Sequence, residues 1–399
     1  MKKVILFLCL LIGTCVCSSA QETGIRFEQG LNWNKLVKKA KKEKRLLFVD
    51  CYTSWCGPCA TMAHTVFTRD TVGNYFNSHF LNVKYDVENE ADGKMLRNKF
   101  RVEVYPTMLF IDPETGEEEH RIVGARNVRG LILAASVAMD SRNSNAGLAR
   151  RYVAGEREPE FLKQYYSALV AAALPGDDRV ALEYLDAVHA EELATAEHWA
   201  MIVRYVNDPL SFIFRNVMTN RERFYGIADR YAVDFFLETT IHTAVSELVG
   251  WKPGKEEFNE ERNNELIKYL RTIDSPVAPG ALANLYAAAC IRNNDFIGLL
   301  GNLKEASKYN VFREGEDKKY FADNIEVFAT CGDKALIRDV ITLIDDKCTI
   351  TESFYGKADL MKLKVRLQEL VGDVVGMEKS KVLEKKYREV GDGAGEWMN

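Results

Sequence analysis

Trp55-Cys56-Gly57-Pro58-Cys59 decides the fold of this chain, because it places two thiols at a junction between a strand and a helix. The near-continuous apolar run at residues 46–52 that precedes it is typical of a central strand, and residues 60–66 after it are typical of a helix. Two cysteines with this spacing suit reversible disulfide chemistry. We therefore expect a redox-active pair here.

The position of the pair predicts which cysteine reacts first. A free Cys thiol has a pKa of about 8.5, and a helix N-terminus favours the thiolate. Cys56 would occupy that end, so we expect Cys56 to attack and Cys59, one turn later and more deeply buried, to resolve. Gly57 and Pro58 let the chain turn into the helix, because a proline loses no needed N–H there.

A pair of this kind can also be half of a zinc site or a structural disulfide. The sequence has no second Cys-x-x-Cys and no His-x3–5-His pair, and His64 and His79 are isolated. We therefore expect no metal. No nucleotide or flavin fingerprint is visible either, so we expect no bound cofactor and a separate protein as the electron donor.

The flanking patterns predict an α/β domain at residues 21–142. Further strands are expected at residues 80–87, 106–112 and 119–123, and helices at 33–43, 91–100 and 127–139. A polar break at residues 140–145 then marks a boundary, after which the patterns are almost all helical. The sequence therefore predicts an all-α domain at residues 143–399.

The last third of the chain carries a faint repeat. Asn294-Asp295, Gly332-Asp333 and Gly372-Asp373 each combine a residue that can end one helix with an aspartate that can cap the next, and the aspartates lie 38 and 40 residues apart. This period suits stacked helical hairpins. We predict a degenerate tetratricopeptide-like array, with an irregular helical domain as the alternative.

Two sets of side chains in the helical part carry expectations about burial. Cys290 and Cys331 lie in apolar runs and are expected to pack inside, whereas Cys348 lies in a polar context and is expected to be more exposed. A dense aromatic segment is interpreted as helix–helix core rather than a peptide groove. It consists of Phe212, Phe214, Phe224, Tyr225, Tyr231, Phe235 and Phe236.

The first twenty residues have the pattern of an export signal. Lys2 and Lys3 precede an apolar core at residues 4–16, and small residues at 18–20 precede Gln21. We expect a cleaved signal peptide at residues 1–20 and an exported, periplasmic protein. A retained membrane anchor and a lipid anchor at Cys15 or Cys17 are the alternatives. The mature chain would carry 51 basic and 58 acidic residues, which argues against nucleic acid as a general partner.

The central stretch resembles the thioredoxin active site residue for residue, and the resemblance covers residues 24–139. Asp50, six residues before Cys56, matches the buried aspartate of that family, although the residues alone leave a turn acid as an alternative. Lys84 matches the lysine paired with that aspartate, with a surface lysine as the alternative. Tyr105-Pro106 matches the loop that carries a cis proline, and Gly124 matches the glycine after the last strand.

The resemblance implies roles for these residues. Asp50 would accept and donate the proton of Cys59, and Lys84 would tune Asp50. Pro106 would shape a groove for an extended partner peptide. The other expected substrate-binding residues are Trp55, Gly57, Pro58 and Tyr105.

The resemblance is closest to the exported bacterial branch, which includes the C-terminal thioredoxin-like domain of membrane disulfide-interchange reductases. Gly57-Pro58 is similar to reducing members, whereas Tyr105 is more similar to protein disulfide isomerases. These features imply an exported thiol–disulfide oxidoreductase that reduces partner proteins. The alternatives are an isomerase or chaperone-like protein whose helical domain holds clients, and a non-enzymatic interaction scaffold with a protein partner on the helical domain.

Overall fold

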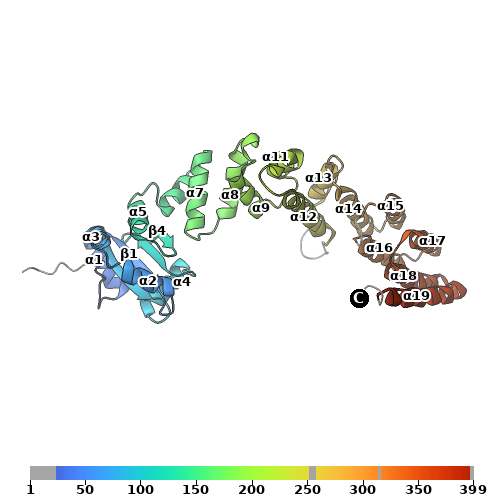
Figure 1. The fold of residues 1–399 in the computed structure, drawn as a ribbon, viewed down its shortest axis with the longest axis horizontal. Coiled ribbons are helices and arrows are strands. Elements are labelled where there is room, and N and C mark those ends of the chain that lie inside the picture. Colours follow the sequence, from blue (N-terminus) through green and yellow to red (C-terminus); the bar gives the residue numbers. More distant parts are fainter. Residues whose placement is uncertain (1–23, 251–257, 313–315, 396–399) are drawn as a thin grey trace, which may run out of the picture. The chain divides into compact units, whose positions relative to one another are not determined.

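The computed structural model describes residues 24–250, 258–312 and 316–395. They form two compact units, the first ending at Ala187 and the second beginning at Val188 (Figure 1). The predicted signal peptide at residues 1–20 lies outside the described residues. Among the residues that are described, no helix combines the length and the apolar character needed to cross a membrane.

A mixed sheet forms the centre of the first unit. Within the described residues it has the strand order β2-β1-β3-β4, with β1 parallel to β2 and antiparallel to β3, and with β3 antiparallel to β4. The apolar run that predicted a central strand is β1, which is paired on both sides. The strands are β1 Leu46–Tyr52, β2 Phe80–Asp86, β3 Thr107–Ile111 and β4 Glu118–Val123.

Helices cover both faces of this sheet, which confirms the predicted fold of the N-terminal domain (Figure 1). α1 and α4 pack on one face, and α2, α3 and α5 pack on the other. The helices of the first unit are α1 Trp33–Glu43, α2 Gly57–Thr65, α3 Asp70–His79, α4 Ala91–Phe100, α5 Val128–Ala138, α6 Asn145–Val153, α7 Pro159–Ala171 and α8 Asp177–Ala187.

Alternation along β1 decides which side chains lie under which helices. Val49 and Cys51 belong to the cluster with α1 and α4, whereas Phe48 belongs to the cluster with α2, α3 and α5. Phe48 is fully buried against aromatic neighbours, and burial of a side chain of this size contributes about 1.5–3 kcal/mol. Because strand side chains alternate with a period of two, Asp50 lies on the face that α2 covers.

The first unit continues beyond the thioredoxin-like elements, because α6 binds the outer edge of β4. The Arg121 backbone N–H donates to Asn145 Oδ1 at 3.0 Å, and Arg150 Nη2 and Ser144 Oγ both bind Glu119. The compact unit therefore runs past residue 142. The domain boundary expected at residues 142/143 stays a prediction.

The second unit contains helices and no strand among its described residues, which confirms the predicted all-α region. Two of its elements, η1 and η2, are short 3-10 helices. The elements are η1 Ala190–Glu192, α9 Ala196–Tyr205, α10 Phe212–Thr219, α11 Arg221–Tyr225, α12 Arg230–Val249, α13 Glu260–Leu270, α14 Ala278–Arg292, α15 Phe296–Tyr309, α16 Glu316–Glu326, η2 Val327–Thr330, α17 Lys334–Ile350, α18 Phe354–Val371 and α19 Val374–Gly395.

The aspartates of the faint repeat do cap helices. Asp295 accepts from the Gly298 N–H at the start of α15, and Asp333 accepts from two backbone N–H groups at the start of α17. Asp373 accepts from the Gly376 N–H in the first turn of α19. The residues that precede them, Asn294, Gly332 and Gly372, all have positive φ. The helix boundaries are therefore as predicted, while the repeat array itself stays a prediction.

One expectation about burial in the second unit is wrong, and another holds for only part of its residues. Cys348 is buried, because it lies one turn after Ile344 on the inner face of α17. In the aromatic segment, three residues are buried as expected, namely Phe214, Phe224 and Phe236. Three others are exposed, namely Phe212, Tyr231 and Phe235. Tyr231 and Phe235 are four residues apart on α12, so they share a face of the helix that points away from its buried side.

Candidate active site

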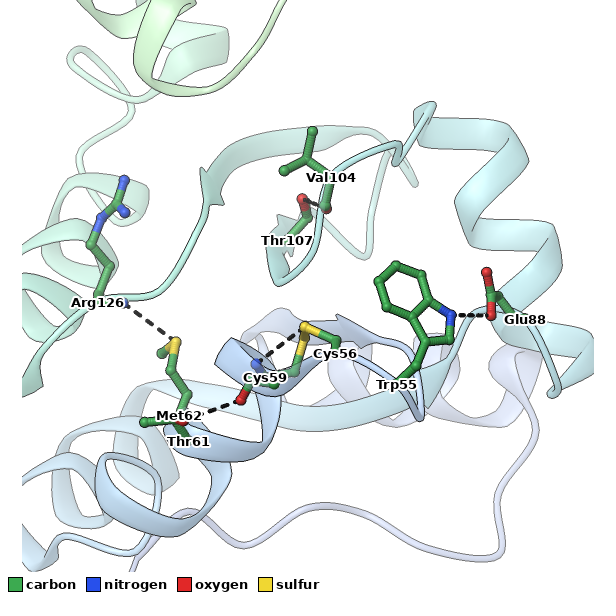
Figure 2. Close-up of a disulfide and its surroundings, with 10 residues drawn as sticks. Trp55, Cys56, Cys59, Thr61, Met62, Glu88, Val104, Thr107 and Arg126 are labelled. Atoms are coloured by element: carbon green, nitrogen blue, oxygen red, sulfur yellow. Dashed lines mark hydrogen bonds between the residues drawn. A yellow bond between two sulfur atoms is a disulfide. The ribbon is translucent and has the colours of Figure 1, made fainter.

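Cys56 and Cys59 are joined in a disulfide at the start of α2 (Figure 2). Cys56 is the N-cap residue, and its Sγ accepts the Cys59 backbone N–H at 3.2 Å. Pro58 lies in the first turn of the helix, where its missing N–H costs nothing. A thiolate on Cys56 would meet the same N–H and the positive end of the helix dipole, both of which favour it over the thiol.

Both cysteines are almost enclosed. Cys56 is 5% exposed and Cys59 is 7% exposed. The sequence predicted that Cys59 would be more deeply buried than Cys56, and these exposed fractions do not show that difference. The residues around the pair, Trp55, Gly57 and Pro58, are exposed. A partner would therefore meet these three residues on its way to the disulfide.

Asp50 is a buried carboxyl group at the end of the strand that leads into Cys56. Its Oδ1 has no hydrogen-bond partner among the described residues. Burial raises the pKa of Asp50 from 3.8 to about 7, while the charge of Lys84 acts in the opposite direction. The carboxyl group can thus take up or release a proton near neutral pH, on the face of the sheet that α2 covers.

Lys84 lies directly beside Asp50 in the pairing of β1 with β2. The lysine is exposed, and its Nζ lies 5.4 Å from the centroid of the Phe27 ring. Within the described residues no ion pair joins the lysine to Asp50. Lys84 therefore acts on Asp50 through its field, by lowering the Asp50 pKa.

The loop before β3 forms a ledge beside the cysteine pair (Figure 2). The peptide bond between Tyr105 and Pro106 is cis, as the resemblance implied. The Pro106 carbonyl accepts the Gly124 N–H at 2.8 Å, which joins this loop to the end of β4. Thr107 Oγ1 donates to the Val104 carbonyl at 2.7 Å and holds the loop from inside.

Trp55 closes one side of this ledge. The edge of its ring meets the Tyr105 ring with the centroids 5.9 Å apart, and its Nε1 donates to Glu88 Oε2 at 2.8 Å. Sequence reasoning missed Glu88. Its place just after β2 is a weak signal, because the end of a neighbouring strand lies close to the end of β1.

Met62 and Arg126 join the active-site helix to the loop after β4. The Arg126 backbone N–H points to Met62 Sδ, with 3.4 Å between N and S. Sequence reasoning missed both residues. Only the two-residue distance of Arg126 from Gly124 could have drawn attention to it.

The site thus holds a disulfide, a buried carboxyl group that can accept a proton, and the loop that forms a ledge beside the disulfide. Among the described residues no group of three or more His, Cys, Asp and Glu side chains could hold a metal ion. The chemistry that these residues support on their own is the exchange of disulfide bonds.

The N-terminal part of this chain is similar in sequence to known proteins. A sequence model of the family described as thioredoxin-like matches residues 27–113, which include the cysteine pair. The thioredoxin H-type of Fagopyrum esculentum is 32% identical over 94 residues, covering 24% of this chain and 73% of that protein. Thioredoxin H-type 1 of Nicotiana tabacum is 35% identical over 94 residues, covering 24% of this chain and 68% of that protein.

A solved structure is also similar to part of this chain. It is a solution structure from Bacteroides thetaiotaomicron that is described as a candidate disulphide-isomerase. It is 42% identical, covers 31% of this chain and 98% of its own, and has a TM-score of 0.28.

Proposed function

The chain belongs to the thioredoxin family through its N-terminal domain and is a thiol–disulfide oxidoreductase, and from this premise we propose that it reduces disulfide bonds in exported partner proteins. The similarity of Gly57-Pro58 to reducing members supports the reducing direction, and one observation carries the exchange chemistry itself. Cys56 caps α2 with its sulfur toward the Cys59 N–H, so the environment that favours a thiolate already exists at the cysteine expected to attack.

The proposed reaction begins with the reduced pair. The Cys56 thiolate attacks one sulfur of the client disulfide; a bond forms between Cys56 and that sulfur, and the other client sulfur leaves as a thiolate that takes a proton. The Cys59 thiol then loses its proton, and its sulfur attacks Cys56. The mixed disulfide breaks, Cys56–Cys59 forms, and the client leaves as a dithiol with the two electrons.

Asp50 is the proposed acceptor for the Cys59 proton. Its pKa of about 7 lets the carboxylate form near neutral pH, and the unpartnered Oδ1 has capacity for a hydrogen bond. Lys84 adjusts this pKa from the neighbouring strand. Return to the dithiol state needs a second dithiol, which we propose is supplied by a separate electron-donor protein.

Export is proposed from the sequence of the first twenty residues. Two lysines, a short apolar core and small residues before Gln21 support a cleaved signal and a periplasmic location. The N-terminal residue of the protein recovered from the periplasmic fraction tests this. Gln21 at that position supports export, and Met1 on a protein recovered only from the cytoplasm would contradict it.

Reduction of a protein disulfide by the full chain, with a dithiol as the electron source, tests the enzymatic proposal. Cys56→Ser should abolish the activity, because Cys56 is the cysteine proposed to form the first mixed disulfide with the client. Cys331→Ser is the matched control, since Cys331 is a free cysteine in the second unit. Equal rates for Cys56→Ser and the unmodified chain would contradict the proposal.

A disulfide isomerase is the second candidate. The observation that favours it is the exposed aromatic pair of α12, in which Tyr231 and Phe235 stack with their ring centroids 5.8 Å apart. Exposed apolar surface of this kind can hold unfolded chains. Refolding of a scrambled protein, compared between the full chain and Tyr231→Ser/Phe235→Ser, separates the candidates. Rescue that depends on the pair supports isomerase activity, and equal performance of both chains counts against it.

A further inference from the structure

Two charged side chains border the cysteine pair from opposite sides. Figure 2 shows Arg126 on one side of the disulfide and Trp55 with Glu88 on the other, with the Val104–Thr107 loop between them. A client segment that lies along this loop would pass from one charge to the other. The two ends of this path along the loop therefore differ in charge.

Several contacts hold Arg126 next to the ledge. Its backbone N–H is bound to Met62 Sδ of the active-site helix, and its Nη1 donates to the Ala125 carbonyl at 3.1 Å. The same Nη1 would lie 3.5 Å from a Cβ added at Gly124. Gly124 in turn donates its N–H to the Pro106 carbonyl, so the guanidinium lies beside a residue bonded to the ledge itself.

The charge of Arg126 is not neutralised by a neighbour. In the described part of the chain no carboxylate lies within ion-pair distance of its guanidinium, and its acceptor there is a neutral carbonyl. A guanidinium carries five N–H donors, and carboxylates bind it best. Arg126 is partly exposed, and within the described residues only its Nη1 has an acceptor.

The opposite side, at Trp55, carries charges of both signs. There Glu88 binds the Trp55 Nε1 and holds a negative charge close to the Tyr105 hydroxyl. Arg97 lowers the pKa of that hydroxyl more strongly than Glu88 raises it, so this side has mixed charge. The Arg126 side therefore offers a cation that has no carboxylate partner within the described residues, whereas the Trp55 side offers charges of both signs.

We propose that Arg126 is a specificity-determining residue, which selects client segments that carry an acidic side chain on its side of the reacting cystine. The proposal rests on the proposed reduction of partner disulfides and names the clients that this site prefers. Arg126 does not touch the reacting sulfurs. Arg126 should therefore change the KM for the client and leave the rate of the chemical step unchanged.

The test uses disulfide-linked peptides that differ at one position. Glu, Gln or Lys is placed two residues before the reacting cysteine in one series and two residues after it in the other, and kcat/KM is measured with the full chain. In one of the two series, Glu should exceed Lys by about five-fold, the size of a partly exposed ion pair, and the preference should fall as salt is added.

Variants at Arg126 then identify the source of the preference. Arg126→Gln should bring the Glu-to-Lys ratio close to one, Arg126→Glu should reverse it, and Arg126→Lys should retain part of it. Arg69→Gln is the control, because Arg69 follows the far end of α2 and should keep the original ratio. The change should appear in KM.

The outcomes separate the inference from the proposed function. Two results would overturn the role of Arg126 and leave the reductase proposal standing. In the first, the unmodified chain turns over all peptides with no Glu-to-Lys preference. In the second, the preference survives Arg126→Gln and Arg126→Glu. If the unmodified chain turns over none of the peptides, the proposed function fails and the inference fails with it.

Discussion

Asp50 combines a structural cost with a chemical use. A carboxyl group on a central strand loses its hydration, and the missing partner for Oδ1 leaves that loss uncompensated. The resulting rise in pKa keeps the proton on Asp50 until the pH approaches 7. In the proposed reaction, a carboxyl group with this pKa can take up the proton of Cys59.

Asp50→Asn should make the protein more stable at pH 8 but not at pH 4. The pKa is raised in the folded state, from 3.8 to about 7, so ionisation weakens folding as the pH rises through this window and the full cost is present above it. A shift of this size sets an upper limit of about 4 kcal/mol on the gain at pH 8. Urea unfolding at both pH values measures it.

The control for this prediction is Asp140→Asn. The Asp140 pKa is lowered, mainly by the hydrogen bond from Asn143, so its ionised form is favoured in the folded state and its replacement should bring no gain. A gain for Asp50→Asn of the same size at pH 4 and pH 8 would contradict the assignment of a raised pKa.

Asp50 should also control the pH dependence of turnover. Resolution of the mixed disulfide by Cys59 should speed up as the pH rises through about 7, because the carboxylate form accepts the thiol proton. Asp50→Asn should slow this step by about a hundred-fold and remove the rise. Single-turnover release of a client peptide between pH 5 and pH 8 measures both effects. A wild-type profile that is flat across pH 7 would exclude this role.

At the scale of elements, the active site depends on three connections to α2. β1 leads directly to Cys56 at the start of α2, and the loop after β4 contacts Met62. α3 follows α2 after a break in the helix near Phe67. The N-terminal segment lies beside this break, where the Ile25 N–H donates to the Phe67 carbonyl, and beside α3, where the backbone of Gly24 lies close to Gly73. α3 has a glycine, Gly73, at the point where its backbone packs directly against the backbone of the N-terminal segment.

Gly73→Ala should destabilise the first unit by about 1–3 kcal/mol, a typical cost of overpacking. A Cβ at Gly73 would lie 2.2 Å from the Gly24 carbonyl oxygen, so the N-terminal segment or α3 must move. The matched control is Gly301→Ala in α15, where a Cβ has nothing within 4 Å and should add about 0.5–1 kcal/mol of stability. Thermal unfolding compares the two, and equal effects would refute the close approach.

Local patterns were enough to predict β1, α2 and the capped starts of α15 and α17. Each of these depends on residues within a few positions of one another. Glu88 and Arg126 could not be predicted, because they reach the site by contacts 33 and 64 residues apart in sequence. Tyr231 and Phe235 were assigned to the core because residue type alone does not say which face of α12 is covered.

For the molecule as a whole, the redox chemistry lies in the first unit and the long helical region continues from it. The attachment of α6 to β4 involves Asn145 and Arg121, which are 24 residues apart, so no local pattern could assign α6 to the first unit. This contact predicts where the chain can be divided.

A chain that ends at Ala187 should be more stable than one that ends at residue 142, with both starting at Gln21. The shorter chain loses the acceptor for the Arg121 N–H and the partners of Glu119. Uncovering these groups should lower the midpoint of thermal unfolding by several degrees, about 4–8 °C for each kcal/mol in a domain of this size. Equal midpoints for the two chains would show that α6 does not stabilise the sheet.

The most direct measurement of the central claim is the site at which clients are trapped. In Cys59→Ser the mixed disulfide cannot be resolved, so client proteins should accumulate on Cys56 when the chain is expressed in its own host. Mass spectrometry should map the linkage to Cys56. Cys56→Ser/Cys59→Ser is the control and should trap none. Clients linked to Cys56 would support a client-facing reductase, whereas no adducts, or adducts that persist in the double variant, would contradict it.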